Sequence, residues 1–244
     1  MKFLNTSFIA ALALIAFTPA TTFAKSGNAD FSVSTGANEG GNAFKVDFDA
    51  ADDYGRKFGI GLEGGRTERV RAKLAIFPDL YREGNVKVNV AEFDINNSSH
   101  NNGDSSHSQK FSVISASRTG QRDLKDDFKL KTELIAALTQ LDQDITRGEK
   151  TLSGSGFGIQ AGAKASLTKK LSAMTEAELR MAVNLIGSLN DDIGPTKEFS
   201  GELLVKRTSG RRIYGGMKAS SSSFGVQGER ERNEFIGATA GIAF

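Results

Sequence analysis

Apolar and polar residues alternate along most of the chain, in runs of about ten residues separated by polar or glycine-containing breaks. In the N-terminal half these runs cover 31–35, 44–50, 58–62, 70–76 and 86–95, followed by a less regular run at 110–117. Alternation with a period of two predicts β-strands with one apolar and one polar face. The phase changes between Val90 and Ala91, which predicts a β-bulge at that point.

The C-terminal half shows the same alternation more regularly. Its runs cover 157–167, 171–185, 199–205, 213–219, 224–228 and 236–244. The polar stretch between 96 and 108 predicts a loop. Because almost every run has the strand period, the sequence predicts an all-β fold.

Two segments fit more than one period. Between 129 and 147, Leu130, Leu134, Leu138 and Ile145 recur at helical spacing, so we expect one short amphipathic helix there, although the same segment also alternates. Between 175 and 189 the alternation is long and unbroken, which favours a strand over a helix. The chain then has about twelve strands, with ten to fourteen compatible with the pattern, and an even number favours the helix.

The first 24 residues have the pattern of a secretory signal peptide. Lys2 precedes an uninterrupted apolar run from Phe8 to Phe17, and Pro19 and Ala24 follow near the expected cleavage point. This run is about half the ~20 residues that a spanning helix needs. We therefore expect residues 1–24 to be removed on export and 25–244 to form a single domain, with a retained anchor as the alternative.

Composition limits the remaining choices. The chain has no cysteine, so disulfides and thiolate sites are excluded, and its net charge of +2 gives no reason to expect a nucleic-acid partner. Glycine is frequent and proline scarce, as expected for strands joined by tight turns. The chain has 17 phenylalanines but no tryptophan and three tyrosines, a weak match to the aromatic girdles of membrane barrels.

The C-terminal run ends in an aromatic residue preceded by apolar residues at every second position: Ile236, Ala238, Ala240, Ile242 and Phe244. This end resembles the terminal strand of bacterial outer-membrane β-barrel proteins. The resemblance implies a closed antiparallel transmembrane up-and-down β-barrel in the outer membrane, in contact with outer-membrane lipid. It also implies that the barrel-insertion machinery reads these five residues as an assembly signal.

In such a barrel the apolar stripes face lipid and the polar stripes face the lumen. The charged side chains of the polar stripes would then line the lumen: Lys45, Asp47, Asp49, Lys57, Glu63, Arg69, Arg71, Lys73, Lys110, Lys164, Glu176, Glu178, Arg180, Glu202, Lys206, Arg212, Lys218 and Glu229. A positive stripe around Arg71 and a negative stripe around Glu178 would create a transverse field, as in diffusion pores.

These features predict a small porin-like channel for passive passage of small solutes. A non-conducting structural barrel with an ion-paired lumen is an alternative, since unpaired charges are costly to bury. A soluble periplasmic barrel that binds an apolar ligand is another, because alternation alone does not tell the two faces apart.

The sequence gives no case for an enzyme. The two histidines, His100 and His107, lie in the predicted polar loop, where a neighbouring hydroxyl such as Ser108 is not oriented as a nucleophile. The same histidines with Asp104 do not have a diagnostic metal-ligand spacing. We therefore expect no catalytic residues, no metal and no cofactor, and interpret both histidines as solvated loop residues.

Overall fold

The structure, a computed structural model, describes residues 28–38, 41–51, 57–65, 67–83, 85–100, 105–209 and 212–243. The predicted signal peptide and Phe244 lie outside these residues. Within the described part the chain forms the strands β1 (Asn28–Asn38), β2 (Gly41–Ala51), β3 (Lys57–Gly64), β4 (Thr67–Glu83), β5 (Val86–His100), β6 (Ser105–Asp123), β7 (Phe128–Arg147), β8 (Lys150–Ser172), β9 (Thr175–Ser188), β10 (Ile193–Arg207), β11 (Arg212–Val226) and β12 (Glu229–Ala243). None of the described segments is a helix long and apolar enough to cross a membrane.

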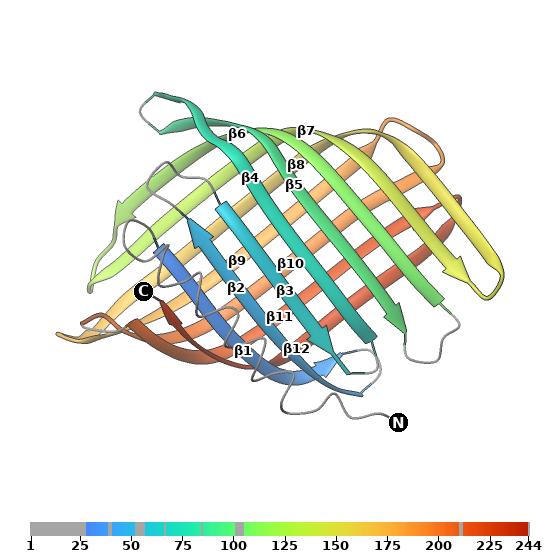
Figure 1. Cartoon of the computed structure of the whole chain (residues 1–244). Coiled ribbons are helices and arrows are strands. Elements are labelled where there is room, and N and C mark those ends of the chain that lie inside the picture. Colours follow the sequence, from blue (N-terminus) through green and yellow to red (C-terminus); the bar gives the residue numbers. More distant parts are fainter. Residues whose placement is uncertain are drawn as a thin grey trace.

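Each strand pairs with its neighbour in the sequence, and every pairing is antiparallel (Figure 1). The first strand also pairs with the last, with Asp30 opposite Ala243 and Asn38 opposite Phe235, so the twelve strands form a closed barrel. The prediction of an all-β, antiparallel fold is confirmed. We call the end where β1 begins and β12 finishes the terminal end, and the opposite end the turn end.

The prediction of a helix at 129–147 is wrong, because this segment forms the strand β7. Leu130, Leu134 and Leu138 lie on its outer face, while Leu141 and Ile145 lie on its inner face and are buried. Apolar residues on both faces of one long strand produce a spacing that resembles that of an amphipathic helix. The segment is apolar on the inner face because it packs against other strands across the lumen, as described below.

The separate strand expected at 224–228 is also wrong. β11 continues to Val226, and Gln227 and Gly228 form a two-residue turn in which Val226 pairs with Glu229. Both turn residues have positive φ, at 49° and 86°, as a type I′ hairpin turn requires. The run at 171–185 is likewise divided by a turn at Ala173 and Met174, which leaves the alternation in phase. The expected strand number therefore agrees with the structure although two of the assigned elements do not.

The predicted bulge in the fifth strand is confirmed by a register shift between Asn89 and Glu92. The expected loop at 96–108 is much shorter than predicted. β5 extends to His100 and β6 begins at Ser105, so most of this polar stretch belongs to two paired strands.

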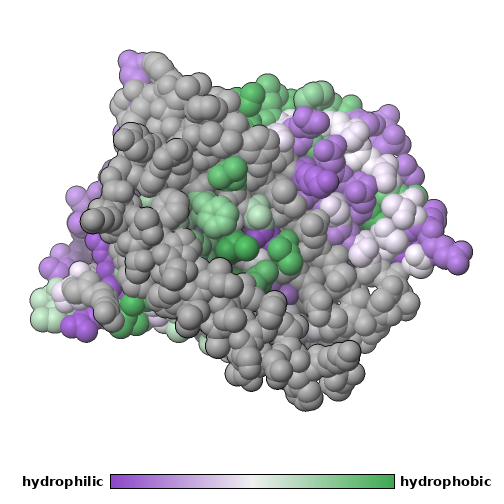
Figure 2. All heavy atoms as spheres, viewed as in Figure 1, coloured by the Kyte–Doolittle hydropathy of each residue, from purple (hydrophilic) through white to green (hydrophobic). Residues whose placement is uncertain are grey.

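Large apolar side chains gather on the outer face of the barrel. In β7 to β12 the exposed ones are Leu134, Leu138, Phe157, Ile159, Leu171, Leu179, Met181, Val183, Leu185, Phe199, Leu203, Val205, Ile213, Met217 and Ile236. In the view of Figure 2, hydrophobic residues of the described part lie mostly toward the middle of the surface and hydrophilic ones toward the ends. An apolar outer face with exposures such as 66% for Phe157 is the reverse of a soluble protein's surface.

The two strands that close the barrel meet at a pair of inward-facing glycines. Gly36 of β1 lies opposite Gly237 of β12. A Cβ atom added at Gly237 would overlap the carbonyl oxygen of Thr35 and the Cα atom of Gly36. Closure therefore depends on the absence of a side chain at this position.

Replacing Gly237 by valine should impair closure, because overpacking a tight contact costs about 1–3 kcal/mol or more. The fraction of protein with heat-modifiable gel mobility should fall well below that of the unmodified chain. Gly187→Val is the control, since a Cβ there meets only the carbonyl oxygen of Ile159, at 4.0 Å. Equal folded fractions for the two variants would contradict the role assigned to the Gly36–Gly237 contact.

Candidate functional site

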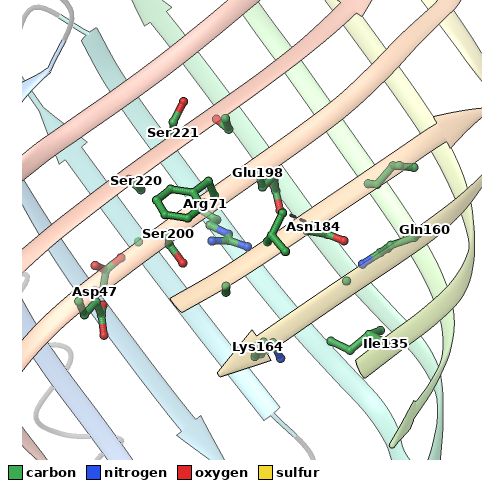
Figure 3. Close-up of a pocket in the computed structure, with 18 of the residues that line it drawn as sticks. Asp47, Arg71, Ile135, Gln160, Lys164, Asn184, Glu198, Ser200, Ser220 and Ser221 are labelled. Carbon is green, nitrogen blue, oxygen red and sulfur yellow. Dashed lines mark hydrogen bonds between the residues drawn. The ribbon is translucent and has the colours of Figure 1, made fainter. Parts of the chain in front are cut away.

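Among the residues that the structure describes, two cavities of about 420 and 380 Å³ open in the lumen and share lining residues on β2, β3, β4, β10 and β11. The shared charged residues are Asp47, Arg71, Glu202 and Lys218. The larger cavity, shown in Figure 3, also has an amide and hydroxyl lining that includes Gln160, Asn184, Ser200 and Ser220. A lining of this kind can hold water and polar solutes.

A chain of alternating charges on the inner face joins β2, β11, β10 and β9. Lys218 Nζ lies 3.1 Å from Asp47 Oδ2 and 3.5 Å from Glu202 Oε1. Arg180 then joins Glu202, at 3.5 Å, to Glu178, at 3.0 Å, and Lys206 also contacts Glu178. Because each charge has a partner of opposite sign, the cost of removing it from bulk water is largely offset.

Further polar contacts hold the inner face. Lys45 pairs with Glu63 at 3.4 Å between neighbouring strands, and Lys164 pairs with Glu133 at 3.1 Å. Near the terminal end the Tyr214 hydroxyl donates a hydrogen bond to Asp30.

The structure describes most of the side chains expected to line the lumen. Those that line one or both cavities are Lys45, Asp47, Asp49, Glu63, Arg71, Lys164, Arg180, Glu202 and Lys218. Glu178 and Lys206 belong to the charge chain, and Glu176 lies opposite Lys206 in the β9–β10 register. Arg212 lies at the terminal end opposite Ala243, and Glu229 lies at the turn end. The side chains of Lys57, Arg69 and Lys73 lie outside the described ones.

Lys110 does not belong to this set, which corrects the prediction. It lies opposite Ile95 and Asp142. The residues of the same strand that are buried on the inner face, such as Gln109 and Ser115, occupy odd-numbered positions. Lys110 therefore belongs to the outer face near the turn end. The irregular alternation of 110–117 left the phase of this strand undetermined, because serines occupy both faces.

The expected negative wall is also absent from the described part of the lumen. Glu178, which was to provide it, is paired with two cations on the same wall, Arg180 and Lys206. The electric fields of paired opposite charges largely cancel each other across the lumen, so this stripe cannot supply one pole of a transverse field.

Toward the turn end, the inner face of β7 packs against strands that are not its neighbours in the sheet. Leu141 contacts Ile186 of β9 and Ile193 of β10, and Ile145 contacts Phe224 and Val226 of β11. We call these six residues the cross-lumen cluster. All are at most 4% exposed, so they form a well-buried apolar contact inside the barrel.

Polar contacts reinforce the cross-lumen cluster. Gln143 donates a hydrogen bond to Thr196 at 3.0 Å, which joins β7 to β10. At the rim Arg147 reaches from β7 to β12, where it binds Glu229 at 2.7 Å and Glu231 at 3.0 Å. The two walls are therefore fixed to each other by apolar and charged contacts together.

His107 is part of this packing, which corrects its interpretation as a solvated loop residue. It lies in β6, is 4% exposed, and its ring meets that of Phe224 edge-on at 4.8 Å. Its Nε2 atom lies 3.2 Å from Asn233 Nδ2. His100 ends β5, but its side chain lies outside the described ones.

Glycines of β8 make room for the cluster. A Cβ at Gly154 would lie 3.0 Å from Ile193, and one at Gly158 would lie 2.8 Å from Leu141. Side chains at these inward positions would push the two walls apart. The sequence shows that this strand is rich in glycine, but it does not show which side chains pack over the glycines.

Several lumen residues were missed because they lie in segments assigned to other elements. Glu133, Gln143 and Arg147 fall within the segment that was expected to be a helix. Glu198, in contrast, follows from the alternation at 199–205 once it is extended by one position along β10, and Asn184 already lies on the polar side of the run at 171–185. Among the described residues, no group of three or more His, Cys, Asp or Glu side chains could hold a metal ion.

Comparisons with known proteins are limited to folds. No family model matches the chain, and no curated protein is similar to it in sequence. Among solved structures, it resembles the translocator domain of the autotransporter NalP from Neisseria meningitidis, at 13% identity and a TM-score of 0.46, covering 97% of this chain and 96% of that one. It also resembles the KdgM porin in complex with disordered oligogalacturonate, at 6% identity and a TM-score of 0.43, with 88% and 99% covered. The NanC porin matches at 11% identity and a TM-score of 0.42, with 88% and 98% covered.

Truncating Phe224 to alanine should lower the free energy of unfolding by about 3–5 kcal/mol, because it opens a cavity in the cross-lumen cluster. Phe157→Ala is the matched control, since lipid or detergent can fill the space left on the outer face. Denaturant-induced unfolding of the barrel in micelles or bilayers measures both. A Phe224→Ala loss no greater than that of Phe157→Ala would contradict the packing described for the cluster.

Proposed function

We propose that the mature chain spans the bacterial outer membrane as a β-barrel. The observation that carries this proposal is the division of the wall: the outer face bears the large exposed apolar side chains, and the inner face bears the paired charges. Lipid requires this arrangement, whereas a soluble barrel that carries an apolar ligand requires the reverse. Closure leaves no unpaired strand edge in contact with lipid.

Within this proposal, residues 1–24 direct export and are cleaved. Ile236, Ala238, Ala240 and Ile242 lie on β12, in the register that places Ile236 on the outer face. Together with Phe244, they form the signal that the barrel-insertion machinery recognises.

We further propose that the barrel is a narrow channel for small polar solutes. The two cavities with shared lining residues support this function, because they form a polar space between charged walls. The cross-lumen cluster fills part of the lumen toward the turn end and would keep the passage narrow.

The same cluster favours a second candidate, a barrel with a structural role and no conduction. Apolar side chains packed at most 4% exposed exclude water from their part of the lumen. Dry apolar constrictions can stop ion flow without blocking a pore sterically. Conductance separates the two candidates.

Lysine substitutions at neighbouring positions of β8 should test the membrane-facing side. Ile159 is 55% exposed on the outer face, and Gln160 lines the larger cavity. Ile159→Lys should destabilise the inserted barrel by about 2–4 kcal/mol, because a cation would face the hydrocarbon. Gln160→Lys places the same charge in the polar lumen and should cost much less. Unfolding in lipid bilayers measures the difference, and equal losses would contradict membrane insertion in this orientation.

The purified barrel should produce discrete current steps when it is inserted into planar bilayers bathed in potassium chloride. A polar, water-holding lumen gives ions a continuous path, so the steps should scale with salt concentration. Heat-modifiable gel mobility confirms that the protein added is folded. Folded, inserted protein that produces no steps would favour the structural candidate over the channel.

A further inference from the structure

The larger cavity contains one carboxylate whose charge is not paired. Glu198 of β10 is half-buried and lies opposite Asn184 of β9, whose Nδ2 atom donates a hydrogen bond to Glu198 Oε2 at 3.2 Å (Figure 3). No lysine or arginine forms an ion pair with it among the residues that the structure describes. Its polar partner within the described part of the chain is therefore a neutral amide.

The other charged groups around this cavity are already engaged. The remaining carboxylates pair with Lys45, Lys164, Lys218 or Arg180: Glu63, Glu133, Asp47 and Glu202. Arg71, the remaining cation of the described lining, has an interaction partner as well. Glu198 is thus the one described carboxylate of this lining that remains available to a cation.

Asn184 provides a second acceptor beside it. Its Oδ1 atom is buried and has no hydrogen-bond partner. The orientation of the amide is fixed, because only Nδ2 can donate to the Glu198 carboxylate. Buried polar atoms in folded proteins nearly always have a partner, so an unsatisfied acceptor indicates a missing donor.

The strand beside this oxygen, β8, carries glycine at the facing position. Gly162 lies opposite Asn184 in the strand register, and a Cβ atom added to it would lie 3.4 Å from Asn184 Oδ1. This is an ordinary van der Waals distance, and glycine leaves the volume of that Cβ atom unfilled. Glu198 therefore lines a cavity with space for a cation, and the Asn184 carbonyl oxygen lies beside it without a donor.

We propose that Glu198 and Asn184 bind small ammonium-type cations in the lumen and make the passage cation-selective. An ammonium group carries one positive charge and several N–H donors, so it can satisfy both the carboxylate and the amide oxygen. The binding part depends only on this pair of residues. The selectivity part rests on the proposed channel function.

Binding can be measured without conduction. The full barrel, folded in detergent micelles, is titrated with ethylammonium chloride while the side-chain amide resonance of Asn184 is followed by NMR. We expect a saturable shift in the millimolar range and a midpoint concentration at least tenfold higher for Glu198→Gln. Tetramethylammonium has the same charge but no N–H donor and should bind several-fold more weakly.

Glu149→Gln is the matched control, because Glu149 is exposed in the turn between β7 and β8 and outside the lumen. Its midpoint concentration should equal that of the unmodified chain. Equal shifts with both cations, or an unchanged midpoint in folded Glu198→Gln, would overturn the proposed site.

Selectivity is measured from the reversal potential across a planar bilayer under a potassium chloride gradient. The unmodified barrel should favour K⁺ over Cl⁻, and Glu198→Gln should lower this preference severalfold, with Glu149→Gln unchanged. Ethylammonium binding without any conductance would contradict the proposed channel function but support the binding site. Conductance with the same ion preference in Glu198→Gln would contradict the selectivity role of Glu198 but support the channel function.

Discussion

Every residue of a closed single-layer wall must face either outward or inward, and this constraint governs the rest of the structure. The outer positions are taken by apolar side chains, so the barrel cannot use them to build an internal core. A barrel of about eight strands is just narrow enough for its inward side chains to fill it. This barrel has twelve strands, so its interior needs additional means of stabilisation.

Two different solutions occur in different parts of the same lumen. Toward the turn end, glycines in β8 let the walls approach, and Leu141 and Phe224 contribute to a cross-lumen apolar contact. Elsewhere the walls stay apart, and alternating charges such as Arg180 and Glu202 hold the inner face in a polar environment. The first solution excludes water and the second requires it, so the larger cavity ends against Ile186 of the cross-lumen cluster.

This division explains what the sequence could and could not predict. Alternation requires only that one face differs from the other, which is why most strands and the bulge near Asn89 could be predicted. It fails where both faces are apolar, as in β7, and where serines make both faces polar, as around Lys110. The turn at Gln227 and Gly228 was missed because Phe224 and Val226 are apolar on the inner face of β11, so the apparent phase changes before the turn and the segment looks like a separate strand. The ion-pair partners of inward charges could not be predicted from the sequence, because Arg147 and Glu231 come together only when β7 and β12 face each other across the lumen.

Glu198 lies between these two regions of the lumen, and this position strengthens the interaction of its charge with a passing ion. Two positions before it on β10 lies Thr196, which is 2% exposed and bonded to Gln143 beneath the cross-lumen cluster. Two positions after it lies Ser200, which lines the larger cavity. The carboxylate therefore stands where the wet part of the lumen meets the dry part. Electrostatic interactions strengthen as water is excluded, so an unpaired charge at this boundary influences a passing ion more than the same charge in the open cavity would. The paired charges nearer the terminal end lack this effect, because each is already neutralised by its neighbour.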